Sequence, residues 1–301
     1  MSERADVEPI TAEIVGGLGN QLFIYACARA VATRVNSPLR FDVSLLAQPA
    51  AGETPRLLAL DWLIEADQIL PVTARTPSSR LIAKLKRSLA LPESAQNFRE
   101  RGFGYDARIR QVKAGTRLFG YFQSWRYFDD IASPLRAELL AKAPRSDWGR
   151  AEESLLAGLG DWTAVHIRRG DYTKPVNADH HGLLDADYYE RAIEQMRTRN
   201  ASSTLVIFSD DPSAAQSLLA HVDARMHFVE PADTSHAMES VLLMSKASAV
   251  VMANSSFSWW GAWLADPTST PALAPTPWFK QALSDADIYY PSWSLLDSRF
   301  R

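Results

Sequence analysis

The sequence predicts an α/β protein of two domains with parallel sheets that face each other across a cleft. The chain has 301 residues, about twice the length of an ordinary domain. Strand–loop–helix units open it, and from Trp162 onward strands and helices alternate regularly, as parallel sheets with covering helices require. The polar stretch Lys142–Asp147 precedes this second region. We therefore expect a boundary near residue 150, with domains at 1–150 and 151–301.

The first half begins with two strands joined through a helix. Residues Thr11–Val15 form an expected strand, Gly16–Gly19 a tight turn, and Asn20–Val35 an alanine-rich helix with apolar residues at helical spacing. A second strand is expected at Leu39–Val43. The aromatic run Tyr121–Trp125 is placed at the end of a further strand.

The second half contains a repeated alternation of strands and helices. We expect strands at Thr163–Ile167, Leu205–Phe208, His227–Val229 and Ala249–Met252, and helices at Tyr188–Arg199, Pro212–His221 and Met238–Lys246. Ligands of open parallel sheets bind outside the carboxyl ends of the strands. The polar residues that follow each strand are therefore the candidate site.

Composition excludes several classes of protein. Lys+Arg number 32 against Asp+Glu 35, a net charge of −3 that offers no general attraction for nucleic acid. Cys27 is the single cysteine, so an intramolecular disulfide and a cysteine zinc cluster are both excluded. The amino-terminal residues have no signal-peptide pattern, and no apolar run reaches membrane-spanning length. A cytoplasmic location is expected.

One segment is strongly basic. Between Gln68 and Pro92 the chain has no acidic residue, but it has five basic ones: Arg75, Arg80, Lys84, Lys86 and Arg87. With leucines at every fourth position, residues 75–89 form a basic amphipathic pattern. Two interpretations stay open, a solvated surface helix or a weak peripheral contact with an anionic membrane face.

The end of the first strand in the second half is followed by two arginines. His166 lies in the strand, and Arg168, Arg169, Gly170 and Asp171 come after it. Paired guanidinium groups beside a sharply bending backbone suit phosphate oxygens, and Asp171 can hold one of them. A structural Arg–Asp ion pair is the alternative.

The second strand end has adjacent carboxylates, Asp210 and Asp211, before Pro212. One of the acids is expected to be a helix N-cap, because Pro212 suits the first helical turn. A metal site is the less favoured interpretation, since side chains of neighbouring residues point apart and a third hard ligand is lacking nearby.

The third strand end places small polar residues before a helix: Asn254, Ser255 and Ser256, followed by Phe257. Unpaired backbone N–H groups and the helix dipole at such a start bind anions. The tryptophans at 259 and 260 are interpreted as core. Together with the two arginines, this helix start predicts a diphosphate site.

Two other patterns compete for a functional interpretation. Gly17 and Gly19 with Asp42 resemble a dinucleotide fingerprint, but Leu22 stands where its third glycine is needed. His180 and His181 near Asp185 and Asp187 resemble a metal cluster. We favour a capping box formed by Asp187 and Glu190 instead.

Five sequence blocks are similar to those of one known family, the bacterial α-1,2-fucosyltransferases of glycosyltransferase family 11. The blocks are Gly-Gly-Leu-Gly-Asn-Gln-Leu-Phe at 16–23, Gly-Tyr-Phe-Gln-Ser-Trp at 120–125, His-Ile-Arg-Arg-Gly-Asp-Tyr at 166–172, Phe-Ser-Asp-Asp at 208–211 and Asn-Ser-Ser-Phe-Ser-Trp-Trp-Gly-Ala-Trp at 254–263. The resemblance spans nearly the whole chain. It implies a GT-B-like fold of two Rossmann-like domains, GDP-β-L-fucose as donor, inversion to an α-linked product and no required metal or other cofactor.

The resemblance also implies roles for individual residues. Arg168 would contact the donor β-phosphate and stabilise the charge on the departing GDP, with Arg169 and Asp171 in support. The remaining donor-side residues would be His166, Asp210, Asp211, Asn254, Ser255, Ser256 and Phe257. Gly19, Asn20 and Gln21 match the loop of the first domain that faces the donor sugar and the acceptor hydroxyl, with Asn20 in the catalytic set.

Two positions depart from the family pattern. The family usually has Glu-Asp where this chain has Glu239 and Ser240, so the acid that contacts the guanine in the family is either absent here or replaced by Glu239. Ile24 replaces a glutamine and is interpreted as packing. Spacing identifies no general base, although Asp42 is a candidate.

The sequence and its resemblance thus predict transfer of L-fucose from GDP-fucose to O2 of a β-galactoside acceptor in surface-glycan synthesis. One version of this hypothesis has the acceptor attached to a lipid. Two alternatives stay open. A nicotinamide oxidoreductase would use the Gly17–Gly19 loop, and a noncatalytic glycan-binding protein would use an aromatic-rich cleft.

Overall fold

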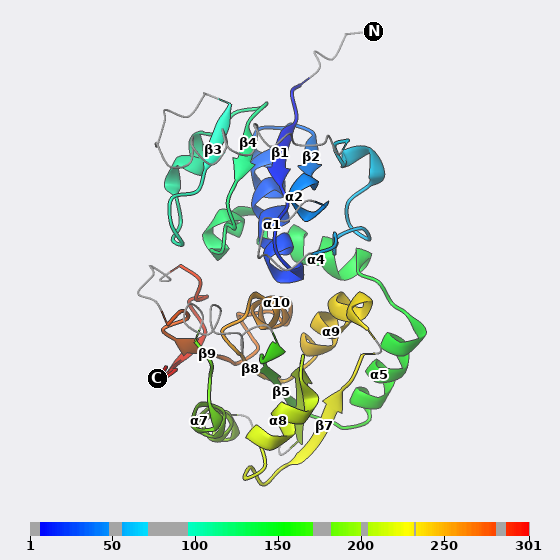
Figure 1. Ribbon diagram of the computed structural model, residues 1–301, viewed down its shortest axis with the longest axis vertical. Coiled ribbons are helices and arrows are strands. Elements are labelled where there is room, and N and C mark those ends of the chain that lie inside the picture. Colours follow the sequence, from blue (N-terminus) through cyan, green and yellow to red (C-terminus); the bar gives the residue numbers. More distant parts are fainter. Residues whose placement is uncertain are drawn as a thin grey trace. The chain divides into compact units, whose positions relative to one another are not determined.

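The computed structural model describes residues 7–47, 56–71, 96–170, 182–199, 204–231, 233–280 and 287–300. The chain divides into two compact units, Met1–Leu135 and Arg136–Arg301 (Figure 1). The division falls inside helix α4 (Ala132–Lys142), earlier in the chain than the boundary predicted near residue 150. Asp171 and the basic residues 75–89 lie outside the described residues.

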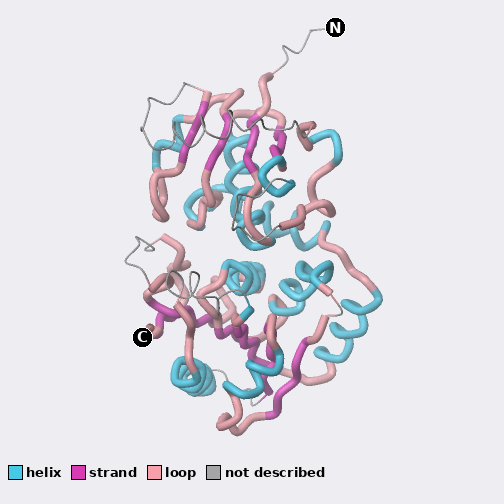
Figure 2. The backbone as a smooth tube through the Cα atoms, viewed as in Figure 1, coloured by secondary structure: helices cyan, strands magenta, loops and turns pink. Residues whose placement is uncertain are grey.

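The first unit contains a parallel sheet of four strands in the order β2-β1-β4-β3. Its strands are labelled in Figure 1 and drawn in magenta in Figure 2. The strands are β1 (Ile10–Glu13), β2 (Leu39–Asp42), β3 (Asn97–Arg99) and β4 (Arg117–Phe119). β1 and β2 are where the sequence predicts them. The strand order reverses between β1 and β4, so the loops after these two strands begin side by side.

Helix α1 (Leu18–Arg34) packs against this sheet and is buried along most of its length. Its alanines and Cys27 allow close approach to the strands, and alanine costs no side-chain entropy in a helix. The other helical segments of this unit are short: α2 (Ser44–Ala47), η1 (Ala66–Gln68), η2 (Ala107–Gln111), η3 (Trp125–Tyr127) and η4 (Asp129–Ile131).

The second unit contains a parallel sheet of six strands in the order β10-β9-β8-β5-β6-β7. The strands are β5 (Trp162–Ile167), β6 (Thr204–Ser209), β7 (Arg225–Val229), β8 (Ala249–Val251), β9 (Ala272–Thr276) and β10 (Ser294–Asp297). Numbered within the unit, this is the 3-2-1-4-5-6 order of doubly wound nucleotide-binding sheets. The order reverses between β5 and β8.

Helices cover both faces of this sheet. They are α5 (Asp147–Ala157), α7 (Ala186–Arg197), α8 (Pro212–Leu218), α9 (Ala237–Met244) and α10 (Ser256–Leu264), with a short η6 (Thr234–His236) before α9. α7 and α8 share one core with the strands. Figure 1 shows α9 and α10 on the other side of the strands. The predicted α/β fold with parallel sheets is confirmed.

The predicted start of α7 is wrong. Its N-cap is Asp185, whose Oδ1 accepts the Tyr188 N–H at 3.1 Å, and Asp187 lies inside the first turn. Burial of Tyr188 and Tyr189 fixes this register, because both rings must face the sheet. Asp187 instead pairs with Arg191 at 2.8 Å and with Arg299 at 3.1 Å.

Candidate functional site

The strand order of the second unit reverses between β5 and β8, and the edge of the sheet at their carboxyl ends is called the β5–β8 crevice below. The two strands pair in parallel, with Val165 opposite Val251. The segments that follow, His166–Gly170 and Met252–Ser255, therefore leave the same edge of the sheet next to each other. Both segments are among the three strand ends that the sequence singles out, and reversals of this kind are where doubly wound folds bind ligands.

Asp210, after the neighbouring strand β6, holds the arginine loop. Its Oδ2 pairs with Arg168 Nη1 at 2.9 Å, and its Oδ1 accepts the backbone N–H of Arg169 at 2.8 Å. Gly170 is required here by space, because a Cβ at this position would lie 2.2 Å from Asp210 Oδ2. The sequence assigns the holding of an arginine to Asp171, which lies outside the described residues, so that assignment remains a prediction; within the described residues, Asp210 pairs with Arg168.

Asp211 has a different function from its neighbour. It is the N-cap of α8, where Oδ1 accepts the Ala214 N–H at 3.0 Å and the Ser213 hydroxyl at 2.8 Å, with Pro212 in the first turn. These donors hold the pKa of the Asp211 carboxyl below its usual range. The prediction that one acid of the pair caps the helix is confirmed, and the donor contact assigned to Asp211 remains a prediction.

His166 is fully buried at the end of β5 and stacks beside Phe257 of α10, with 5.2 Å between ring centroids. Burial, and secondarily the positive charge of Arg168, lower the pKa of His166 to about 3. Its Nδ1 is buried without a hydrogen-bond partner among the residues described here. The imidazole is therefore neutral and a weak base near neutral pH, a state that suits a polar contact.

The start of α10 lies beside this histidine. Ser255 is its N-cap and accepts the Phe257 N–H at 3.3 Å, and Ser256 opens the helix. Asn254 Nδ2 donates to the carbonyls of Gly182 and Trp278, both at 3.3 Å. Asn254 thus fixes the loop through its amide nitrogen. The helix start supplies the N–H groups and dipole of an anion site.

The tryptophans that follow are core, as predicted. Trp259 and Trp260 are fully buried and pack edge-to-face with ring centroids 5.1 Å apart. Trp263 stacks on Trp259, and Gly261 packs against Met244 of α9. This aromatic layer fixes α10 and with it the start of the helix at Ser255 and Ser256.

Two adjacent tyrosines of α7, which are not among the predicted site residues, support the β5–β8 crevice. The Tyr188 hydroxyl donates to the Met252 carbonyl at 2.8 Å, after β8. The main chain of Arg168, after β5, forms a hydrogen bond with the Tyr189 hydroxyl. Both side chains are buried. The sequence does indicate this role, because two tyrosines follow each other in the first turn of a helix and buried tyrosine hydroxyls usually have a hydrogen-bond partner.

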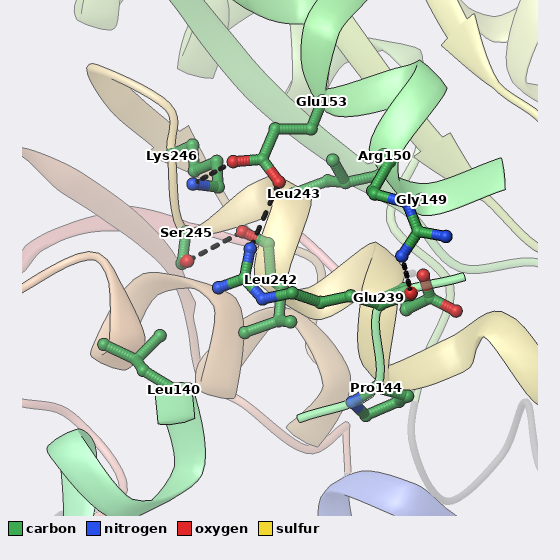
Figure 3. Close-up of a pocket in the computed structure, with 11 residues that line it drawn as sticks. Leu140, Pro144, Gly149, Arg150, Glu153, Glu239, Leu242, Leu243, Ser245 and Lys246 are labelled. Carbon is green, nitrogen blue, oxygen red and sulfur yellow. Dashed lines mark hydrogen bonds and ion pairs between the residues drawn. The ribbon is translucent and has the colours of Figure 1, made fainter. Parts of the chain in front are cut away.

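Glu239, the predicted guanine contact, binds the start of α5. Its Oε2 accepts the Ser146 N–H at 2.7 Å and the Ser146 hydroxyl at 2.9 Å, and a Cβ on Gly149 would lie 1.9 Å away. Figure 3 draws it in a pocket between α5 and α9 whose lining includes none of the residues after β5, β6 or β8. This Oε2 therefore holds a helix end, and a nucleotide contact by Glu239 remains a prediction.

The first unit has its own reversal, between β1 and β4. After β1, Asn20 lies in the first turn of α1, and its Oδ1 accepts Gln123 Nε2 from the segment after β4 at 2.8 Å. Gly16, with φ at +77°, lets the turn close against Asn20, because a Cβ there would lie 2.6 Å from Asn20 Nδ2. Gly19 is buried in the same turn. Gln123 is absent from the predicted site, although it belongs to the Gly-Tyr-Phe-Gln-Ser-Trp block.

Gln21 is fully buried, and its amide has three partners. Nε2 donates to the carbonyls of Gly16 and Leu57, each at 2.9 Å, and Oε1 accepts the Ala59 N–H at 2.9 Å. These bonds fix the segment around Leu57 to α1. The side chain therefore supports the loop from within, and the acceptor-side role of Gln21 remains a prediction.

Asp42 is already engaged at the end of β2. Its Oδ2 pairs with Arg117 at 2.8 Å, and its Oδ1 accepts the Ser44 N–H at 3.0 Å. A dinucleotide fingerprint needs such an acid to bind ribose hydroxyls. These contacts weaken the nicotinamide alternative and the candidacy of Asp42 as a base.

Neither a metal cluster nor a membrane helix is found in the part of the chain that the structure describes. No three His, Cys, Asp or Glu side chains gather there in a way that could hold an ion. Asp185 is the cap of α7, and His180 and His181 lie outside the described residues. No described helix is long and apolar enough to cross a bilayer.

The known proteins that are similar in sequence to this chain are glycosyltransferases. The sequence model of Glycosyl transferase family 11 matches residues 9–297. An alpha-1,2-colitosyltransferase of Escherichia coli is 30% identical, covering 94% of this chain and 97% of the relative. The O-antigen biosynthesis glycosyltransferase WbnK of the same organism is 29% identical, covering 88% of this chain and 93% of the relative. A galactoside 2-alpha-L-fucosyltransferase of Bos taurus is 27% identical, covering 59% of this chain and 50% of its own length.

Solved structures resemble the chain more distantly. The fucosyltransferase NodZ from Bradyrhizobium has 12% identity and a TM-score of 0.46, covering 85% of this chain and 92% of its own. A family 9 glycosyl transferase from Veillonella parvula has 9% identity and a TM-score of 0.49, covering 99% of this chain and 89% of its own.

Proposed function

Because the chain belongs to glycosyl transferase family 11, we propose that it transfers L-fucose from GDP-β-L-fucose to O2 of a β-galactoside, with inversion at the sugar carbon. The observation that carries the proposal is the Asp210-held arginine loop beside the start of α10, at the β5–β8 crevice. This combination of a fixed guanidinium group with a helix start suits a diphosphate.

The chemistry requires stabilisation of a leaving group above all. As the bond between the sugar carbon and the β-phosphate oxygen breaks, GDP gains negative charge and the fucosyl unit becomes oxocarbenium-like. Arg168 and the N–H groups of α10 are fixed donors that stabilise this charge without reorganisation. His166, neutral and with a buried unpartnered nitrogen, provides a polar contact for the nucleotide.

The same arrangement makes metal-independent transfer a reasonable proposal. A cation that neutralises the diphosphate in other transferases is replaced here by Arg168 and a helix dipole. No cofactor is assigned, and GDP-fucose is the donor substrate.

The first unit is proposed to serve the acceptor. Asn20, fixed by Gln123 at 2.8 Å, provides an amide for the acceptor hydroxyl or the donor sugar. Gly19 and Gly16 allow the backbone of this turn to approach closely, and Gln21 keeps the turn in shape from below. The acceptor is a galactoside end of a surface-glycan precursor, and its attachment to a lipid carrier remains a hypothesis.

A second donor is favoured by one comparison. The relative with 30% identity is named an alpha-1,2-colitosyltransferase, and colitose is L-fucose without its 3-hydroxyl group. A site for colitose has no need of partners for that hydroxyl. GDP-colitose is therefore the second candidate donor.

The test is a transfer assay with both donors. The purified chain is incubated with GDP-fucose or GDP-colitose and a panel of β-galactosides, and the linkage of each product is assigned by NMR. We expect an α-1,2-linked product, and no product from the matched 2-deoxygalactoside. Absence of transfer from either donor would contradict the proposal, and NADH binding seen by fluorescence in its place would favour an oxidoreductase. Glycan binding unaffected by Arg168→Ala, without transfer, would favour a noncatalytic binding protein.

A further inference from the structure

Glu100 follows β3 and binds the backbone of the segment after β4. Its Oε2 accepts the N–H groups of Tyr121 and Phe122, each at 2.9 Å. Parallel pairing of β3 with β4 fixes this position, since Arg99 lies opposite Phe119 and the Glu100 N–H donates to the Phe119 carbonyl at 2.9 Å. One carboxylate oxygen thus binds two consecutive amides of a turn.

The turn that Glu100 binds is strained. Phe122 has φ at +53°, a left-handed conformation that is costly for a bulky residue. Its ring is fully buried, stacked 6.3 Å from Phe98 and edge-on 5.3 Å from Tyr127. Such strain persists only where the surroundings enforce it. Glu100 and the aromatic cluster of Phe98, Phe122 and Tyr127 enforce it here.

Gly120 shows how closely the carboxylate fits this turn. A Cβ at Gly120 would lie 2.6 Å from both Cβ and Oε2 of Glu100. The glycine therefore leaves room for the carboxylate to reach the next two amides. The residue directly after Phe122 is Gln123, whose amide binds Asn20. A continuous set of contacts thus runs from Glu100 through the turn to Asn20.

Burial of the Glu100 carboxyl group, including its second oxygen, brings its ionisation into the range near neutral pH. Oε1 is buried and has no hydrogen-bond partner within the described residues. Burial raises the pKa of Glu100 to about 7, and the Phe122 amide, the Tyr127 hydroxyl and the Tyr121 amide oppose that rise. The titratable groups that face it are the Tyr127 hydroxyl from η3, the Asp106 carboxylate before η2 and the Cys27 thiol of α1.

We propose that Glu100 is a positioning residue that holds the Gly120–Gln123 turn, and through it the Gln123–Asn20 pair, in the geometry needed for sugar transfer. The inference rests on the proposed function, in which Asn20 contacts a substrate. The ionised carboxylate is the form that binds the turn most firmly, because hydrogen bonds to a charged acceptor are stronger than those to a neutral one. Activity should therefore rise with pH as Glu100 ionises.

The experiment compares Glu100→Gln with Glu100→Ala, using Glu65→Gln, at an exposed helix cap of the same unit, as control. kcat and the KM of each substrate are measured from pH 5.5 to 9, with thermal melts. Gln keeps a carbonyl oxygen for both amides, so Glu100→Gln should stay within a few-fold of wild type at pH 8 but lose the rise in kcat near pH 7. Glu100→Ala should lose at least about tenfold in kcat, as a displaced group does, with the donor KM little changed.

Two results would overturn the inference. Glu100→Gln as inactive as Glu100→Ala at every pH would show proton transfer rather than positioning, and an Ala variant with wild-type kcat would show no role. If Glu100→Ala does not fold, the pH profile of Glu100→Gln decides: an unchanged rise near pH 7 contradicts the proposal. A wild-type chain that transfers no sugar refutes the proposed function itself, whereas these variant patterns in an active enzyme refute the role of Glu100 alone.

Discussion

Asp210 Oδ2 lies 2.9 Å from Arg168 Nη1, so the loop after one strand is held by the carboxylate after the next. The same carboxylate accepts the Arg169 N–H at 2.8 Å. An arginine held in this way keeps a fixed direction before a substrate arrives. Preorganisation of this kind is what gives fixed donors their effect on developing charge.

Arg168→Ala should reduce transfer at least about a hundredfold while the fold survives. A charge-assisted contact is worth about 1.5 to 3 kcal/mol in a ground state, and more where charge develops. Arg168→Lys should fail as well, since an ammonium group cannot bind two oxygens as a fork. Steady-state kinetics beside circular dichroism makes the check, and activity within a few-fold of wild type would refute the role.

Replacing Asp210 should mainly reduce activity, whereas replacing Asp211 should mainly reduce stability. Asp210→Ala releases the arginine loop, and kcat should fall at least about tenfold through misplacement of Arg168. Asp211→Ala removes the α8 cap and should lower the free energy of unfolding by about 1 kcal/mol, with a much smaller loss of kcat. Urea unfolding and kinetics on both variants test the contrast, which equal effects on kcat would contradict.

Gly170→Ala should resemble Asp210→Ala. The added Cβ would lie 2.2 Å from Asp210 Oδ2, so the carboxylate must leave its place beside the arginines. Gly158→Ala is the control, because Gly158 is the C-cap of α5 and is not one of the residues after β5, β6 or β8. A Cβ at Gly158 would lie 3.3 Å from the Leu155 carbonyl oxygen. We expect at least about a tenfold loss of kcat for the first variant. A fully active Gly170→Ala enzyme would show that the contact is dispensable.

Removal of metal ions should leave transfer intact. In the proposed function, Arg168 and the start of α10 take the role that a divalent cation has in metal-dependent transferases. The assay is run after treatment with EDTA and again with added Mn²⁺ or Mg²⁺. Loss of activity on chelation with recovery on addition of a cation would show that the paired acids bind metal after all.

Glu100 should make stability and activity respond to pH in opposite directions. Its pKa is raised from 4.5 to about 7 in the folded chain, so the folded state binds more protons and the free energy of unfolding falls as pH rises through this range. The decrease is at most about 3 kcal/mol, and remaining solvent exposure reduces it. Glu100→Gln should lack this decrease. Chemical unfolding at pH 5 and pH 8 measures it, and parallel curves for both proteins would contradict the assignment.

Much of the second unit is predictable from local sequence. Apolar runs bounded by polar residues locate β5, β6, β7 and β8, and Asp-Pro locates the start of α8. The strands β9 and β10 were missed, because Pro275 interrupts one pattern and β10 is half exposed. Two aspartates also compete to cap α7, and burial of the tyrosines, a tertiary effect, decides between them.

The candidate site is predictable as a set of strand ends but not as a set of contacts. The pairing of Arg168 with Asp210 depends on β5 and β6 being neighbours, which no local pattern states. The same limit hid Gln123 beside Asn20 and Glu100 beside Phe122. Conversely, Gln21 and Glu239 have the residue types of binding groups, but the Gln21 amide binds the protein's own backbone and Glu239 Oε2 binds Ser146.

The tyrosine pair of α7 gives the crevice a single mechanical support. Tyr188 is bonded to the chain after β8 and Tyr189 to the chain after β5, and consecutive residues of a helix cannot slide past one another. The spacing of the two strand ends is therefore set by a rigid helix turn rather than by loop conformations. A displacement of α7 would therefore act on both strand ends at once.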